Sequence, residues 1–160
     1  MNLPTPPSED QLFEAARRGE VSALQAALAA GVSVDAANAR GFTALVLASY
    51  DDHLAAARLL LDAGANPNHR DAAGNTALMG VSFKGYPEIA RLLLERGANP
   101  DLQNSTGGTA LLFAVMFGRH ELLKILLDAG ADQSIQDARG FTARHLANQQ
   151  GDQAALALLA

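Results

Sequence analysis

Four histidines are the residues of this 160-residue chain that could act as general bases or metal ligands: His53, His69, His120 and His145. Acid–base catalysis requires its groups within hydrogen-bond reach of one another, and a histidine metal site requires several ligands together. No two of these histidines have the spacing of a ligand pair, and they occupy different positions of the repeated pattern described below. The sequence therefore predicts structural or solvated histidines.

The other residue types give no stronger sign of catalysis. The chain has no cysteine, which excludes a disulfide scaffold, a thiolate zinc site and a cysteine nucleophile. Neither of the glycine-rich phosphate-binding motifs is present, and carboxylates such as Asp51 and Asp52 are typical of a solvated surface. A net charge of −5 with two lysines argues against a nucleic-acid backbone as ligand. We expect no enzyme activity, no metal and no cofactor.

The chain also lacks the features of a membrane or secreted protein. Its longest apolar run is far below the ~20 residues that cross a bilayer. The first ten residues, MNLPTPPSED, have neither the basic start nor the apolar centre of a signal peptide. We expect a cytoplasmic protein, with residues 1–7 forming a flexible, proline-rich leader.

Glycine and threonine recur at intervals of 33 residues. This spacing indicates that the chain is built from repeated units with the same secondary structure. No insertion interrupts the register. The repeated positions are Gly31, Gly64, Gly97 and Gly130; Gly41, Gly74, Gly107 and Gly140; Thr43, Thr76, Thr109 and Thr142; and Gly19, Asp52, Gly85, Gly118 and Gly151.

Each repeated position has a chemical role. Asn or Asp three residues before a glycine, as in DAAG and DARG, starts a turn. The threonine after that glycine predicts a helix N-cap, and Asp10 supplies the equivalent oxygen in the first unit. A helix of about nine residues follows and ends near the next glycine. A second helix, such as EIARLLLERG, has an apolar face that one unit cannot bury alone.

The pattern D-x-x-G-x-T-A-L-x-x-A, followed by an E-I-x-x-L-L-L helix and G-A, resembles the ankyrin repeat. The resemblance covers five units, approximately residues 8–37, 38–70, 71–103, 104–136 and 137–160, and implies one domain over residues 8–160. It implies an all-α solenoid of stacked helix-turn-helix units with short β-hairpin-like loops. The alanine- and leucine-rich composition is similar to bacterial-type members.

Two departures from the family pattern affect the expected structure. The usual T-P-L-H reads T-A-L-V, T-A-L-M and T-A-L-L in the central units, so the family histidine is present only as His145. Gly80 and Val81 stand where the neighbouring units carry Leu-Ala and Phe-Ala. Because glycine disfavours a helix interior, we expect an irregular first helix in the third unit.

In ankyrin-like folds the turn tips and the first helices line a concave groove, and the resemblance places the candidate binding residues there. The last positions of the first helices are aromatic or large in the three central units. The alternative, that these side chains belong to the core, remains open. The candidate partner-binding residues are Tyr50, Asp51, Phe83, Lys84, Met116, Phe117, Arg40, Phe42 and Asn75.

The resemblance implies a non-catalytic protein–protein interaction module that binds an unidentified partner protein through this groove. Two alternatives remain: an accessory or inhibitory subunit of a specific enzyme, and a self-associating structural protein. We expect a monomer, with a weak homodimer possible through apolar surface left by Leu158 in the last helix.

Overall fold

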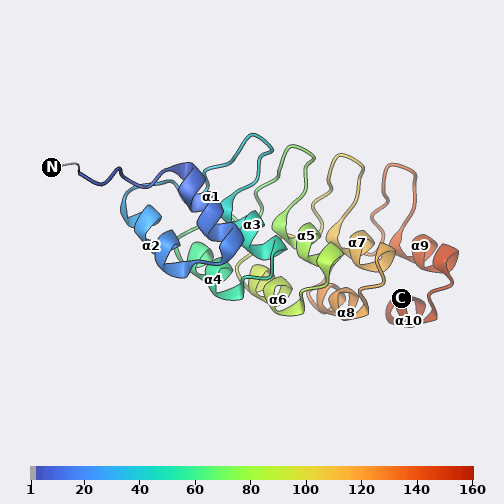
Figure 1. Cartoon of the computed structure of the whole chain (residues 1–160). Coiled ribbons are helices and arrows are strands. Elements are labelled where there is room, and N and C mark those ends of the chain that lie inside the picture. Colours follow the sequence, from blue (N-terminus) through green and yellow to red (C-terminus); the bar gives the residue numbers. More distant parts are fainter. Residues whose placement is uncertain (1–2) are drawn as a thin grey trace.

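The computed structural model describes residues 3–160, which form helices joined by short loops. The helices are α1 (Glu9–Arg18), α2 (Val21–Ala29), α3 (Ala44–Tyr50), α4 (Leu54–Asp62), α5 (Ala77–Lys84), α6 (Pro87–Glu95), α7 (Ala110–Met116), α8 (His120–Asp128), α9 (Ala143–Gln150) and α10 (Gln153–Leu158). They alternate between two rows (Figure 1). We call the odd-numbered helices the first helices and the even-numbered ones the second helices.

Threonine starts each first helix after α1, as its spacing predicts. The hydroxyl oxygens of Thr43, Thr76, Thr109 and Thr142 accept the backbone N–H three residues later, which satisfies a donor that the helix itself leaves free. The first unit differs from the prediction. Ser8, not Asp10, caps α1, because Ser8 and Gln11 form a reciprocal capping box and Asp10 lies within the first turn.

The loops before the first helices are hairpin-like but contain no strand within residues 3–160, where pairing is limited to one isolated bridge between Ala37 and Thr43. The predicted turns are confirmed. Asn38 Oδ1, for example, accepts the backbone N–H groups of Arg40 and Phe42. The side chain therefore replaces backbone partners that a short loop cannot supply.

Successive loops are also joined by backbone hydrogen bonds. The N–H of Ala72 donates to the carbonyl of Arg40 (3.0 Å), that of Ser105 to Ala73 (2.9 Å), and the next pair, Ala138 and Thr106, repeats the contact at 2.9 Å. These bonds form a ladder along the row of loop tips in Figure 1.

The core lies between the two rows of helices. Leucines from the second helices, such as Leu60, Leu93 and Leu126, are fully buried in the same core as Leu45 and Leu78 of the first helices. Each first helix contacts the next first helix, and each second helix contacts the next second helix. The chain is therefore an all-α solenoid, in which each unit buries its apolar face against its neighbours.

Residues 3–7 of the expected leader contain no helix and precede the Ser8 cap, and Leu3 is exposed. The first two residues of that leader lie outside the described residues.

Candidate functional site

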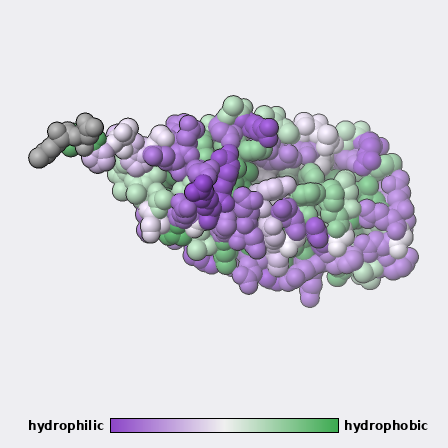
Figure 2. Space-filling view, viewed as in Figure 1, coloured by the Kyte–Doolittle hydropathy of each residue, from purple (hydrophilic) through white to green (hydrophobic). Residues whose placement is uncertain are grey.

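The aromatic residues at the ends of α3, α5 and α7 lie at the surface. Tyr50 is 42% exposed, Phe117 is 40% exposed and Met116 is 39% exposed, while Phe83 is half-buried. In Figure 2, hydrophobic surface (green) lies among hydrophilic residues (purple) over the first helices of the central units. These side chains are therefore partly accessible to a binding partner.

The rings contact one another across the units. The Tyr50 and Phe83 ring centroids are 6.3 Å apart with nearly parallel planes, and Phe83 meets Phe117 edge to face at 4.6 Å. Phe113 continues the series, with its centroid 6.2 Å from that of Phe117. Edge-to-face and offset geometries are the favourable ones for aromatic pairs, so each ring helps to hold the next in place.

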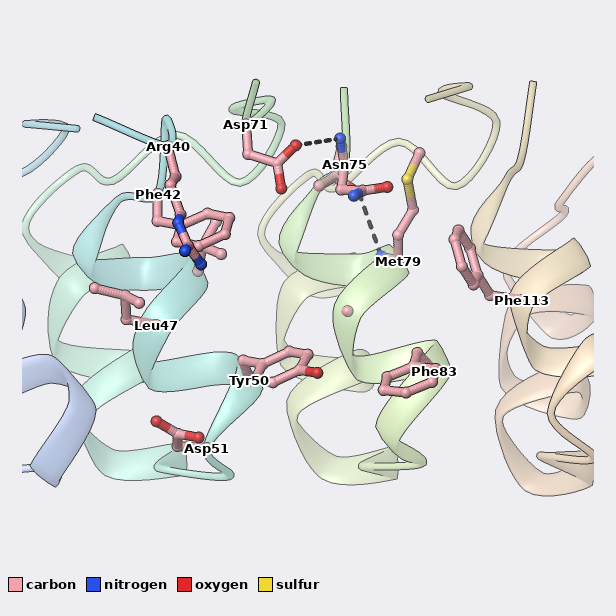
Figure 3. A pocket seen from close by; sticks show the side chains of 13 residues that line it. Arg40, Phe42, Leu47, Tyr50, Asp51, Asp71, Asn75, Met79, Phe83 and Phe113 are labelled. Carbon is pink, nitrogen blue, oxygen red and sulfur yellow. Dashed lines mark hydrogen bonds between the residues drawn. The ribbon is translucent and has the colours of Figure 1, made fainter. Parts of the chain in front are cut away.

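A hollow of about 450 Å³ opens beside these rings, between the loop tips and the first helices α3 and α5 (Figure 3). Six of the nine predicted site residues line it: Arg40, Phe42, Tyr50, Asp51, Asn75 and Phe83. We call this the α3–α5 hollow. Its other lining residues are Val46, Leu47, Asp71, Thr76, Met79, Gly80 and Phe113.

Gly80 forms part of the floor of the α3–α5 hollow. It occupies the position where α3 carries Leu47 and α7 carries Phe113, so the missing side chain leaves space. A Cβ atom on Gly80 would lie 3.4 Å from Cδ2 of the Tyr50 ring. The expected irregularity of this helix is wrong. The helix α5 is continuous over Ala77–Lys84, because core packing on both sides outweighs the weak helix preference of one glycine.

Charged groups border the hollow without charged partners. Arg40 and Asp51 are exposed, and within residues 3–160 neither forms an ion pair. Lys84 Nζ lies 4.8 Å from the Tyr50 ring centroid and 5.9 Å from that of Tyr86. A lysine over a ring face gains a cation–π attraction and keeps its charge available at the rim.

The two remaining predicted residues at the loop tips are tied to the scaffold. Phe42 is half-buried and packs against the core. Asn75 Oδ1 accepts a hydrogen bond from Asn104 Nδ2 at 2.8 Å, which links two neighbouring loops. Asn75 also receives support through its N–H, which donates to Asp71 (Figure 3). Both residues line the hollow from fixed positions.

A comparison with protein families identifies the repeat. The family model described as ankyrin repeats (three copies) matches residues 12–104 and 78–160. The chain belongs to the ankyrin-repeat family. Members of this family are generally protein–protein interaction modules and typically have no catalytic activity. A search of curated proteins returned no match to this ankyrin-repeat chain.

The surface of this ankyrin-repeat protein also includes residues that the sequence interpretation missed. Met116 lines a second hollow of about 520 Å³, together with Phe113 and the tips of the loops before α7 and α9. Phe113 lines both hollows. The signal was its position one helical turn before Met116, because residues three apart share a helix face.

Asp137 and Arg139 form the loop side of the second hollow. Their side chains pair at 2.7 Å. Burial raises the pKa of Asp137, but hydrogen bonds from the Arg139 side chain and from the N–H of Phe141 outweigh burial, so the pKa lies below its ordinary value. Arg139 also lies 4.9 Å from the Phe141 ring, so its guanidinium is held by two contacts.

The histidines of the ankyrin units hold loops and caps. His53 Nε2 lies 2.8 Å from the Arg17 carbonyl oxygen, and His69 Nε2 lies 3.0 Å from that of Gly41. His145 Nδ1 accepts the N–H of Thr142 within its own unit. Each of these contacts connects or starts elements of the fold.

His120 and Asp152 form the one histidine–carboxylate pair among residues 3–160, with Nε2 and Oδ2 2.7 Å apart. The Asp152 carboxylate also accepts the N–H of Ala155 and so caps α10. This backbone bond and the hydrogen bond to His120 lower the pKa of Asp152. The described residues contain no group of three or more His, Asp or Glu that could hold a metal ion. None of the helices α1 to α10 has the length and hydropathy that a membrane-spanning helix needs.

Proposed function

We propose that this protein is a non-catalytic interaction module that binds a partner protein through the groove, defined as the surface formed by the loop tips and the exposed ends of α3, α5 and α7. The observation that carries the proposal is the cluster of Tyr50, Phe83 and Phe117, which is partly exposed and lies beside the α3–α5 hollow. Exposed aromatic groups bordered by charges are typical of binding hot spots.

The energetics favour these rings as anchors. Complete burial of one such side chain contributes ~1.5–3 kcal/mol. The rings already contact one another, and their helices are fixed by the core, so ordering them on binding costs little conformational entropy. The uncharged, apolar centre and the charged rim of Arg40, Asp51 and Lys84 would then supply affinity and orientation respectively.

Affinity capture from the native cell tests the proposal, with the wild-type protein beside a Tyr50→Ala, Phe83→Ala and Phe117→Ala triple variant. We expect the triple variant to lose the proteins that the wild type captures, while each single variant keeps a melting temperature close to the wild-type value. Purified partner and protein should then show a matching loss of affinity by calorimetry.

Leu158→Ala is the matched control, because Leu158 is 37% exposed but lies in α10, away from the groove. It should capture the same proteins as the wild type. Unfolding of the single ring variants, or equal capture by the triple variant, would contradict the proposal. If one enzyme is captured and its activity changes on binding, the partner is specified as that enzyme and the protein as its accessory or inhibitory subunit.

The proposal includes a cytoplasmic protein with no nucleic-acid ligand and no cofactor. The supporting observations are the absence of cysteine and the net charge of −5. Fractionation of the native cell tests the cytoplasmic location, and a filter-binding assay with DNA and RNA tests the absence of a nucleic-acid ligand.

A further inference from the structure

The segment before α1 has the composition of an extended ligand. Residues 3–7 read Leu-Pro-Thr-Pro-Pro and contain three of the six prolines of the chain. Proline restricts φ to values near those of polyproline II, so such a segment is partly pre-ordered before it binds. Leu3 is 88% exposed and contributes an apolar side chain that its own fold does not bury.

The groove has the complementary surface. Proline-rich segments dock in grooves lined by aromatic residues, and Tyr50, Phe83 and Phe117 line this one in sequence. The α3–α5 hollow beside Tyr50 has an open floor because Gly80 has no side chain. The rings of Tyr50, Phe83 and Phe117, which suit contact with prolines, thus lie next to the α3–α5 hollow, which suits an aliphatic side chain.

Unpaired basic groups lie at the rim of the hollow, and unpaired acidic groups follow the proline-rich segment. Asp51 at the same rim is also unpaired in the described part of the chain, so two of the three charged residues of the rim are basic. Arg40 and Lys84 at the rim of the hollow have no carboxylate partner among residues 3–160. Glu9 and Asp10, which follow the proline-rich segment, have no basic partner in the same range. Opposite charges attract over several ångströms in water and orient two surfaces as they meet.

We propose that residues 3–7 of one copy bind in the groove of a second copy, with Leu3 in the α3–α5 hollow and the prolines on the rings of Tyr50, Phe83 and Phe117. The occupant is another molecule because residues 3–7 run away from the array in Figure 1. This inference rests on the proposed function in one respect, the groove as a protein-binding surface. Self-association then competes with the partner and rises with protein concentration.

Sedimentation velocity over about 10 µM to about 1 mM tests the proposal, because this range covers weak association with a dissociation constant on the order of 100 µM. The wild-type chain should sediment faster as concentration rises. Leu3→Asp removes the apolar anchor, and Gly80→Leu fills the hollow. Each variant should weaken association at least about tenfold. Leu158→Ala is the matched control, because Leu158 is 37% exposed in α10 and does not line the hollow, and it should associate as the wild type does.

A mixing experiment separates this contact from any other interface. The Leu3→Asp variant keeps an intact groove and the Gly80→Leu variant keeps an intact leader, so an equimolar mixture should recover association that neither variant shows alone. A labelled peptide of residues 2–10 should bind the wild type and the Leu3→Asp variant, but not the Gly80→Leu variant, in fluorescence anisotropy.

A wild type that is monomeric throughout the range overturns the proposal, as does association that survives in both variants or a mixture that stays monomeric. Each of these results would leave groove-dependent capture of a partner unchanged. Failure of this inference and failure of the proposed function are therefore distinguishable.

Discussion

Alanine at Gly80 should stabilise the protein. Gly80 lies inside α5 without a positive φ, where alanine is favoured over glycine by up to ~1 kcal/mol. The added Cβ would lie 3.4 Å from Cδ2 of Tyr50, at the limit of an ordinary van der Waals contact, and Tyr50 is 42% exposed, so a small shift of its ring suffices. We expect Gly80→Ala to raise the free energy of unfolding by ~0.5–1 kcal/mol.

The comparison variant is Gly41→Ala, which makes the same change at a glycine of the opposite kind. Gly41 has φ +78°, and a Cβ there would lie 2.8 Å from the backbone nitrogen of Ala72. The left-handed conformation alone costs a residue with a side chain ~1–2 kcal/mol, and the neighbouring backbone cannot rotate away as a side chain can. Gly41→Ala should therefore destabilise by more than that amount.

Urea unfolding followed by circular dichroism at 222 nm measures both effects. The two variants should move the unfolding midpoint in opposite directions, Gly80→Ala upward and Gly41→Ala downward. In thermal unfolding of a chain of this size, 1 kcal/mol corresponds to a shift of ~2–4 °C in melting temperature. A lower midpoint for Gly80→Ala would show that the Tyr50 ring cannot move and would refute the account of the hollow floor. A neutral Gly41→Ala would refute the account of the loops.

Four further substitutions test other parts of the structure. Ser49→Ala should stabilise by ~1 kcal/mol in urea unfolding, because its buried hydroxyl has no hydrogen-bond partner among residues 3–160. Ser82→Ala should destabilise by about as much, because its hydroxyl donates to the Leu78 carbonyl. Leu126→Ala, at a fully buried position, should lower the free energy of unfolding by ~2–5 kcal/mol. The lowered pKa of Asp152 means that its contribution is present above the ordinary pKa of an aspartate and is lost as pH falls through the lowered value. Melting curves across acidic pH should therefore show less acid destabilisation in Asp152→Asn than in the wild type. An unchanged acid response would contradict the lowered pKa, which is caused by the hydrogen bonds from the Ala155 N–H and from His120.

Local chemistry explains why most of the scaffold could be predicted from the sequence. A threonine cap or an Asx turn is formed by residues within four positions of one another, so Thr43 and Asn38 carry their own evidence in the sequence. The prediction that Asp10 caps the first helix was wrong, and the cause is again local. In the first unit, residues 3–7 do not form the Asx turn that precedes the other first helices, and Ser8 with Gln11 forms a capping box two residues earlier.

The candidate site was less predictable because its contacts join different units. The 33-residue period placed Tyr50 and Phe83 in equivalent positions, but it did not predict how each ring is oriented relative to its neighbour. Gly80 indicated a weakened helix when considered alone. Only the position of the Tyr50 ring over it shows that the glycine opens a hollow. Packing between side chains about 30 residues apart does not follow from helix periodicity.

The loop ladder has a consequence for how this surface can change over time. Its hydrogen bonds join main-chain atoms only. The residues whose carbonyl groups accept them are Arg40, Ala73 and Thr106, and the side chains of these residues have little in common chemically. Substituting a tip side chain leaves the hydrogen bond intact. Evolution can therefore change the side chains at the loop tips one position at a time, and with them binding specificity, while the backbone of the loops stays the same.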